Sequence, residues 1–143
     1  METEFVPYEL AVKLKRIGFD EPCLAFYQIE YAEVIPTMVD DNEEYRLTGF
    51  RTCKNSKIPE HYVSAPIFSQ SFRWFREKNF YVSINTYHSV SLDKPFGLSI
   101  DYLHESGKWD YFDYRGESDF ETYEEAELAC LTKLIKIVEK RTK

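Results

Sequence analysis

The chain has 143 residues, a net charge of -7 at pH 7 and an aromatic share of 17%. This length suits one domain over residues 1–143, whose core needs neither metal ions nor disulfide bonds. The acidic balance argues against nucleic acid as a partner, because phosphate backbones are repelled, and it favours a basic protein partner. The rings are too many to scatter singly, so we expect some to line an interface, a ligand groove or a second packed layer.

The first predicted element is a helix in PYELAVKLKRIGF (7–19). Leu10 and Leu14 belong to one apolar stripe at helical spacing. Pro7 suits the first helical position, and Gly18 suits the residue just past the end. The segments that follow predict a strand at CLAFYQIEYA (23–32), an acidic loop at 39–44, a returning strand at YRLTGFRTC (45–53) and a loop at KNSKIPEH (54–61).

A strongly amphipathic middle helix is predicted for PIFSQSFRWFREK (about 66–78). Its apolar arc on a helical wheel holds Ile67, Phe68, Ser71, Phe72, Trp74 and Phe75. Arg73 and Arg76 lie close to Trp74 in the sequence, and such a pair could bind a phosphate or carboxylate by bidentate contacts. The alternative is that both arginines belong to the solvated face of a packed helix.

Three strands follow, at about 80–88, 96–104 and 108–116. With a hairpin turn at ESGK, Tyr102 lies opposite Asp110. With the preceding loop centred on Leu92, Ile84 lies opposite Ile100. Under this register one face is apolar and forms the core: Phe80, Val82, Ile84, Phe96, Leu98, Ile100, Phe112 and Tyr114.

The last element is a long C-terminal helix in TYEEAELACLTKLIKIVEKR (about 122–141), where Thr122 and Glu125 fit a capping box. Together the elements predict an α+β fold, an antiparallel sheet of three to five strands packed on one face by the middle and C-terminal helices. The N-terminal helix and first hairpin either extend this sheet or cover part of its second face.

The second face of the sheet is the leading candidate site, because it combines rings, hydroxyls and carboxylates. The register places Ser83, Asp101 and Tyr111 in one row across the strands. Such a face can bind a peptide or a small polar ligand by stacking and hydrogen bonds, or it is the solvated side of the sheet. The residues predicted on it are Tyr81, Ser83, Asn85, Tyr87, Ser99, Asp101, Trp109, Tyr111, Asp113 and Arg115.

No catalytic signature accompanies this face, which favours a non-enzymatic protein while leaving catalysis open. The three histidines do not have metal-ligand spacing, and neither a nucleophile elbow nor a phosphate-binding glycine motif is present. No metal or cofactor is therefore expected. The order of one helix, three strands and a last helix also occurs in double-stranded RNA-binding domains. Those need a basic start of the last helix, and the sequence at this position is ETYEEAE.

The compartment is expected to be a reducing cytoplasm. The N-terminal sequence lacks the regions of a secretory signal, and no window approaches the roughly 18 apolar residues of a membrane span. The three cysteines, Cys23, Cys53 and Cys130, include no CxxC pair, so neither a disulfide framework nor a zinc site is expected.

Three segments resemble a group of small uncharacterised proteins of phages and prophages in Bacteroidetes-type bacteria. They are FVPYELAVKLKRIGFDEPCLAFY, SAPIFSQSFRWFREKNFYVSI and TYEEAELACLTKLIKIVE, about half of the chain. The resemblance implies a phage origin, a location in the cytoplasm of a bacterial host cell, and no particular activity.

We therefore expect a phage accessory protein that binds a host protein or a defence factor without catalysis. The alternative is a pocket protein that binds or turns over a nucleotide-like or sugar-like ligand, and a homodimer is a further option. The candidate binding residues are Tyr81, Asn85, Asp101, Trp109, Tyr111, Asp113 and Arg115 on the sheet, with Arg73 and Arg76 on the middle helix.

Overall fold

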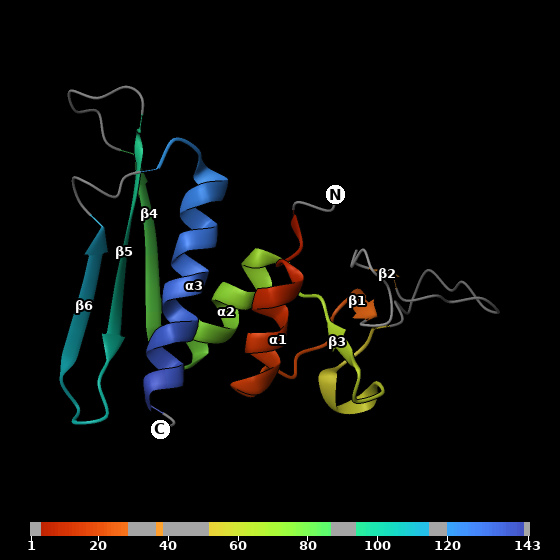
Figure 1. Ribbon diagram of the computed structural model, residues 1–143. Helices are drawn as coiled ribbons and strands as arrows, with labels where there is room; N and C mark the ends of the chain where they lie inside the picture. Colours follow the sequence, from red (N-terminus) through yellow and green to blue (C-terminus); the bar gives the residue numbers. More distant parts are fainter. Residues whose placement is uncertain (1–3, 29–36, 39–51, 87–93, 115–119, 142–143) are drawn as a thin grey trace, which may run out of the picture. The chain divides into compact units, whose positions relative to one another are not determined.

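A computed structural model of the protein describes residues 4–28, 37–38, 52–86, 94–114 and 120–141. The described residues form three α-helices and two antiparallel sheets, which confirms the predicted α+β class (Figure 1). The chain divides into two compact units, an N-terminal unit (Met1–Gln70) and a C-terminal unit (Ser71–Lys143). A single domain over 1–143 stays a prediction.

The N-terminal unit begins with helix α1 (Tyr8–Arg16), inside the predicted span. The helix ends because Gly18 adopts a φ of 100°. This left-handed conformation has a low energetic cost for glycine, which has no Cβ. The backbone N–H of Gly18 then bonds to the carbonyl of Lys15, and that of Phe19 to the carbonyl of Leu14. These two bonds form a Schellman motif that satisfies the last helical carbonyls.

The sheet of the N-terminal unit has the strand order β2-β1-β3. Its strands are β1 (Ala25–Gln28), β2 (Thr37–Met38) and β3 (Tyr62–Ser64). Strand β1 lies within the predicted 23–32, whereas β3 lies in a segment for which the sequence predicted no element. Of the predicted returning strand 45–53, only Thr52 and Cys53 are described, and Cys53 forms an isolated bridge with Cys23. The acidic loop 39–44 lies outside the described residues, and the loop 54–61 contains a short 3₁₀ helix, η2 (Asn55–Lys57).

Helix α2 (Phe68–Glu77) has the predicted amphipathic character. Trp74 and Phe75 are buried, whereas Arg73 and Arg76 are exposed. Ile67, placed on the apolar arc by the sequence, precedes the helix and is exposed. The helix therefore uses its aromatic residues as its buried side.

The sheet of the C-terminal unit consists of β4 (Phe80–Thr86), β5 (Phe96–Leu103) and β6 (Trp109–Tyr114), in the order β4-β5-β6. The predicted pairing of Tyr102 with Asp110 is confirmed. The predicted pairing of Ile84 with Ile100 is wrong, because Val82 pairs with Ile100. This shift by two residues leaves the described side chains on their predicted faces, since side chains alternate with a period of two, and changes only the cross-strand rows.

Helix α3 (Tyr123–Arg141) packs along the apolar face of this sheet, against β4 and β5 (Figure 1). Its first turn is capped as predicted, because the Thr122 hydroxyl accepts the Glu125 N–H at 3.1 Å. In the described residues β1, β2 and β3 form a sheet of their own, so the expectation that the first hairpin extends the C-terminal sheet is wrong. The buried residues of the C-terminal core are Phe80, Leu98, Ile100, Ala126, Cys130, Leu131, Leu134 and Ile135.

Candidate functional site

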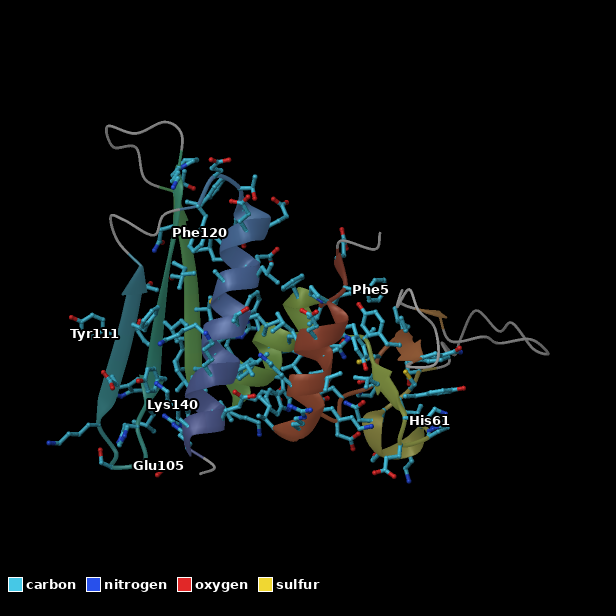
Figure 2. All side chains as sticks on the ribbon, in the orientation of Figure 1. Phe5, His61, Glu105, Tyr111, Phe120 and Lys140 are labelled. Carbon is cyan, nitrogen blue, oxygen red and sulfur yellow. The ribbon has the colours of Figure 1, made fainter. Side chains whose placement is uncertain are left out.

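The second face of the β4-β5-β6 sheet carries exposed aromatic side chains. Tyr81 is 44% exposed, Trp109 60% and Tyr111 72%. Asn85 and Asp101 on the same face are exposed as well. These side chains are available to a partner, and the face is not a second packed layer. Tyr111 projects away from α3 in Figure 2.

The observed register brings Tyr81, Asp101 and Tyr111 into one row across the three strands. Trp109 belongs to the neighbouring row, opposite Leu103. The rings of Tyr81 and Trp109 nevertheless approach to 5.8 Å between centroids, at an interplanar angle of 42°. We call Tyr81, Asp101, Trp109 and Tyr111 together the aromatic face. It joins three rings to a carboxylate, a combination that attracts cationic groups by cation–π and charge interactions.

The predicted rows differ from the observed ones because of the two-residue shift of β4. Ser83 pairs with Ser99 instead of Asp101, and Asn85 pairs with Gly97 instead of Ser99. Asn85 therefore lies further along the sheet from Asp101 than the sequence indicated. Asp113 pairs with Ser99, with its side chain outside the described set, and Tyr87 and Arg115 lie outside the described residues altogether.

Arg73 and Arg76 lie on the exposed side of α2, whereas the residues of the aromatic face belong to β4, β5 and β6. The sequence placed them close to Trp74, but this indole is only 6% exposed. A cation does lie over the Trp74 ring, and it belongs to Lys78, with Nζ 4.6 Å from the ring centroid. Nothing in this geometry joins the two arginines to the other candidate residues.

A cavity that the sequence did not predict lies between the C-terminal half of α3 and the β5–β6 hairpin. Its volume is about 420 Å³. The Tyr102 hydroxyl donates to Asp110 Oδ2 at 3.1 Å within it. Burial, and then the contact with Asp110, raises the pKa of Tyr102, which keeps this hydroxyl protonated and donating. The lining residues are Tyr102, His104, Glu105, Asp110, Phe112, Lys133, Ile137, Lys140 and Arg141, and we call this the hairpin cavity.

The only sequence signal for the hairpin cavity was the set of basic residues at the end of the last helix. Such residues are usual at helix C-termini, where they interact favourably with the helix dipole. Their convergence on the hairpin depends on the packing of α3, which periodicity alone does not give. The candidate residues predicted from the sequence therefore included none of these lining residues.

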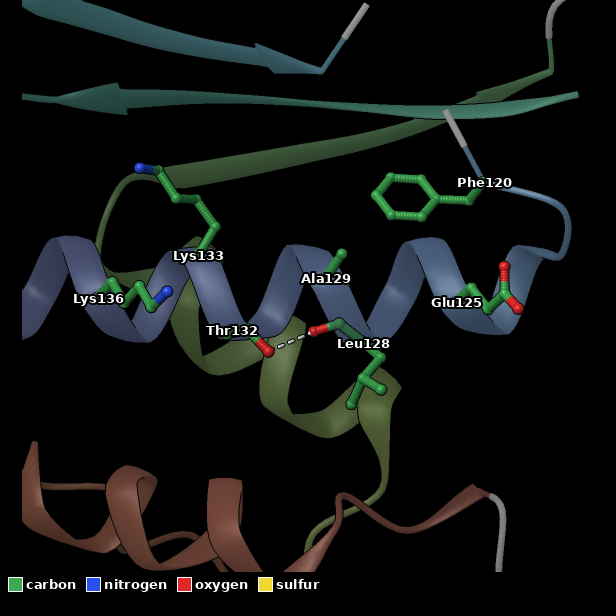
Figure 3. Close-up of a pocket in the computed structure, with 7 residues that line it drawn as sticks. All are labelled: Phe120, Glu125, Leu128, Ala129, Thr132, Lys133 and Lys136. Carbon is green, nitrogen blue, oxygen red and sulfur yellow. Dashed lines mark hydrogen bonds between the residues drawn. The ribbon is translucent and has the colours of Figure 1, made fainter. Parts of the chain in front are cut away.

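A second cavity, of about 440 Å³, lies along α3 between Glu125 and Lys136 (Figure 3). Its lining is mainly apolar at Phe120, Leu128 and Ala129. The Thr132 hydroxyl, also in the lining, is occupied by a 2.7 Å hydrogen bond to the Leu128 carbonyl. The charged side chains of the lining are Glu125, Lys133 and Lys136, and Lys133 also lines the hairpin cavity.

The cysteines are not activated as nucleophiles. Burial raises the pKa of the Cys23 and Cys130 thiols to about 12 and also raises that of Cys53, so all three are thiols near neutral pH. In the part of the chain that the structure describes, no group of three His, Cys, Asp or Glu side chains could hold a metal ion. None of the described helices is long and apolar enough to cross a membrane.

Comparison with known proteins yields no relative whose activity could guide the assignment of a function. No protein-family model, no curated protein and no solved structure matches the chain. A function for this chain therefore rests on the geometry of its two sites, the aromatic face and the hairpin cavity.

Proposed function

We propose that the protein acts by non-catalytic binding and that its aromatic face takes a basic segment of a protein partner. The observation that carries this proposal is the exposure of three aromatic rings on regular strands around the carboxylate of Asp101. Rings fixed on strands lose little conformational freedom when a partner binds, so their burial contributes efficiently to affinity.

Charge complementarity supports a basic partner. The chain carries -7 at pH 7, and Asp101 lies in the same row as Tyr81 and Tyr111. A lysine or arginine side chain can pack its stem on the rings and place its charge beside the carboxylate. The carboxylate of Asp101 would repel an acidic segment, and the net negative charge of the chain would repel nucleic acid.

The biological setting of this proposal follows the resemblance to phage and prophage proteins. A phage accessory protein in the bacterial cytoplasm would meet host proteins and defence factors as partners. The alternative, a pocket for a nucleotide-like or sugar-like ligand beside Asp101, Tyr111 and Arg115, is less favoured. The hairpin cavity and the cavity along α3 are lined by other residues than Asp101 and Tyr111.

The test uses a peptide of alternating lysine and serine, with an acidic peptide of the same length as its control. Binding is followed by NMR through the indole N–H signals, because Trp109 is 60% exposed whereas Trp74 is 6% exposed. We expect the basic peptide to shift the Trp109 signal. Trp109→Ala, monitored through backbone signals, and Asp101→Asn should each weaken binding at least about tenfold, since each removes a principal contact.

Tyr123→Ala is the matched control, because Tyr123 is similarly exposed, at 45%, but lies at the start of α3. This variant should bind the basic peptide like the unaltered protein. Equal binding by all variants, or equal binding of the acidic peptide, would contradict the proposal. A concentration-dependent dimer, seen by light scattering and abolished by Tyr111→Ala, would instead assign the face to self-association.

A further inference from the structure

We propose that the hairpin cavity binds the oxyanion group, a carboxylate or phosphate, of a small molecule. Its side chains come from α3 and from the ends of β5 and β6, all within the C-terminal unit. Lys140 and Glu105 mark this end of the unit in Figure 2, whereas Tyr111 projects from the far side of the sheet. The site is therefore separate from the aromatic face and does not depend on the function proposed for it.

Arg141 is the best placed group for an oxyanion. One of its terminal nitrogens donates to the Leu103 carbonyl at 2.7 Å. Its guanidinium lies over the rings of Phe80 and Tyr102, at 4.8 and 5.3 Å from their centroids. A guanidinium has five N–H donors, so four remain after the bond to Leu103. The contacts fix the plane of the guanidinium, and a fixed plane favours bidentate binding of a carboxylate or phosphate.

Two lysines also line the cavity, and they share one face of α3 because they are seven residues, about two turns, apart. Lys133 and Lys140 lie in the cavity lining, eight residues and one residue before Arg141. Lys133 Nζ lies 4.1 Å from the centroid of the Phe112 ring. Neither lysine makes an ion pair with a carboxylate of the described residues, so both charges are available to a ligand.

The carboxylate facing these cations is already engaged. Asp110 Oδ2 accepts the Tyr102 hydroxyl at 3.1 Å, and Asp110 Oδ1 accepts the backbone N–H of Tyr111 at 2.9 Å. Glu105, in the hairpin turn, is exposed and belongs to the same lining. The cavity thus has three cations and two carboxylates, a local positive excess in a chain of net charge -7.

The His104 imidazole supplies a further hydrogen-bond donor to the cavity. His104 Nδ1 accepts the backbone N–H of Ser106 at 3.2 Å and lies 3.0 Å from the Ser106 hydroxyl. A neutral imidazole whose Nδ1 accepts a hydrogen bond carries its hydrogen on Nε2, which makes Nε2 a donor. The C-terminal dipole of α3 opposes an anion by roughly half a charge, which is less than the positive excess of the lining.

The experiment measures binding of inorganic phosphate and, separately, of acetate by NMR titration of the full chain at constant ionic strength. We expect saturable shifts of the His104 ring signals, and the ion that gives them identifies the oxyanion. Lys133→Gln combined with Lys140→Gln should weaken binding at least tenfold. Lys136→Gln is the matched control, because Lys136 lies on the same helix but lines the other cavity. Glu105→Gln should strengthen binding.

Arg141→Gln also removes the bond to Leu103, so a folding check by amide spectra accompanies that variant, and the lysine variants test the proposal independently. Absence of saturable binding by either ion would overturn the proposal. An equal loss of binding free energy per lysine removed in Lys136→Gln and in the double lysine variant would overturn it as well, because the effect would then be one of overall charge.

Discussion

The rings of Tyr81 and Trp109 lie 5.8 Å apart between centroids although the two residues belong to the opposite edge strands of the β4-β5-β6 sheet. Edge strands of a three-stranded sheet are separated by about 10 Å, so both side chains lean over the central strand β5. Tyr81 pairs with Asp101 and Trp109 is paired with Leu103, which places the ring contact diagonally over these two residues. The aromatic face is therefore a connected surface rather than a set of isolated rings.

This ring contact predicts a measurable coupling between the two edge strands. A double-mutant cycle of Tyr81→Ala and Trp109→Ala should give a coupling of about 0.5–1 kcal/mol in the free energy of unfolding, as for other exposed aromatic pairs. The measurement is urea denaturation of the four proteins. Strictly additive effects would contradict the contact, and Tyr81→Ala with Tyr123→Ala should be additive because Tyr123 lies on α3.

The sequence predicted the faces of this sheet but not the rows, for a physical reason. The alternation of side chains places the apolar residues of each strand on one face of the sheet. Because this face must be buried, a shift of the register by one residue is excluded. A shift by two residues satisfies the same pattern, and Val82 and Ile84 are nearly equivalent partners for Ile100. The packing of the sheet against α3, which periodicity does not contain, is needed to distinguish the two registers.

The hairpin cavity could not be predicted from the sequence, for a different reason. Arg141 reaches the Leu103 carbonyl across 38 positions of the chain, a contact that no local pattern contains. Strand β3 was missed similarly, because its three residues, Tyr62–Ser64, are too few to show alternation. In contrast, the start of α3 followed from local capping signals at Thr122 and Glu125.

The side-chain amide of Asn55 is expected to stabilise the N-terminal unit. Its Nδ2 donates to the Phe19 carbonyl at 2.8 Å, and its Oδ1 accepts the Ser64 N–H at 2.9 Å. Asn55→Ala removes both of these buried hydrogen bonds, so it should lower the free energy of unfolding by about 1–3 kcal/mol. Urea denaturation measures this. The exposed Asn85→Ala should change stability by less than about 0.5 kcal/mol, and a similar loss in both variants would contradict the role of Asn55.

Asp20 is expected to give a small stabilisation that depends on pH. Its Oδ1 accepts the Ser56 N–H at 2.7 Å, and the hydrogen bonds from Ser56 lower the pKa of Asp20 below 3.8 in the folded chain. A carboxyl group whose pKa is lower in the folded than in the unfolded chain stabilises the folded state at pH values above its unfolded pKa. This contribution is lost as the pH falls through the folded pKa. Asp20→Asn should therefore be less stable at pH 7 by at most about 1 kcal/mol, because the group is largely exposed. The difference should shrink by about pH 2.5, below the unfolded value, and a constant difference would contradict the linkage.

The three cysteines are expected to resist thiol reagents in the native protein. Burial raises the pKa of Cys23 and Cys130 to about 12, so at pH 8 only about one thiol in ten thousand is ionised. Above pH 9.0 these thiols ionise in the unfolded chain but stay protonated in the folded chain. The folded state therefore has its full stability below pH 9.0 and loses stability as the pH rises toward 12. Reaction with a chromogenic disulfide at pH 8 should be slow until urea is added, when all three thiols react. Cys130→Ala should remove part of the alkaline loss of stability, and rapid labelling of native Cys130 would show that its burial is transient.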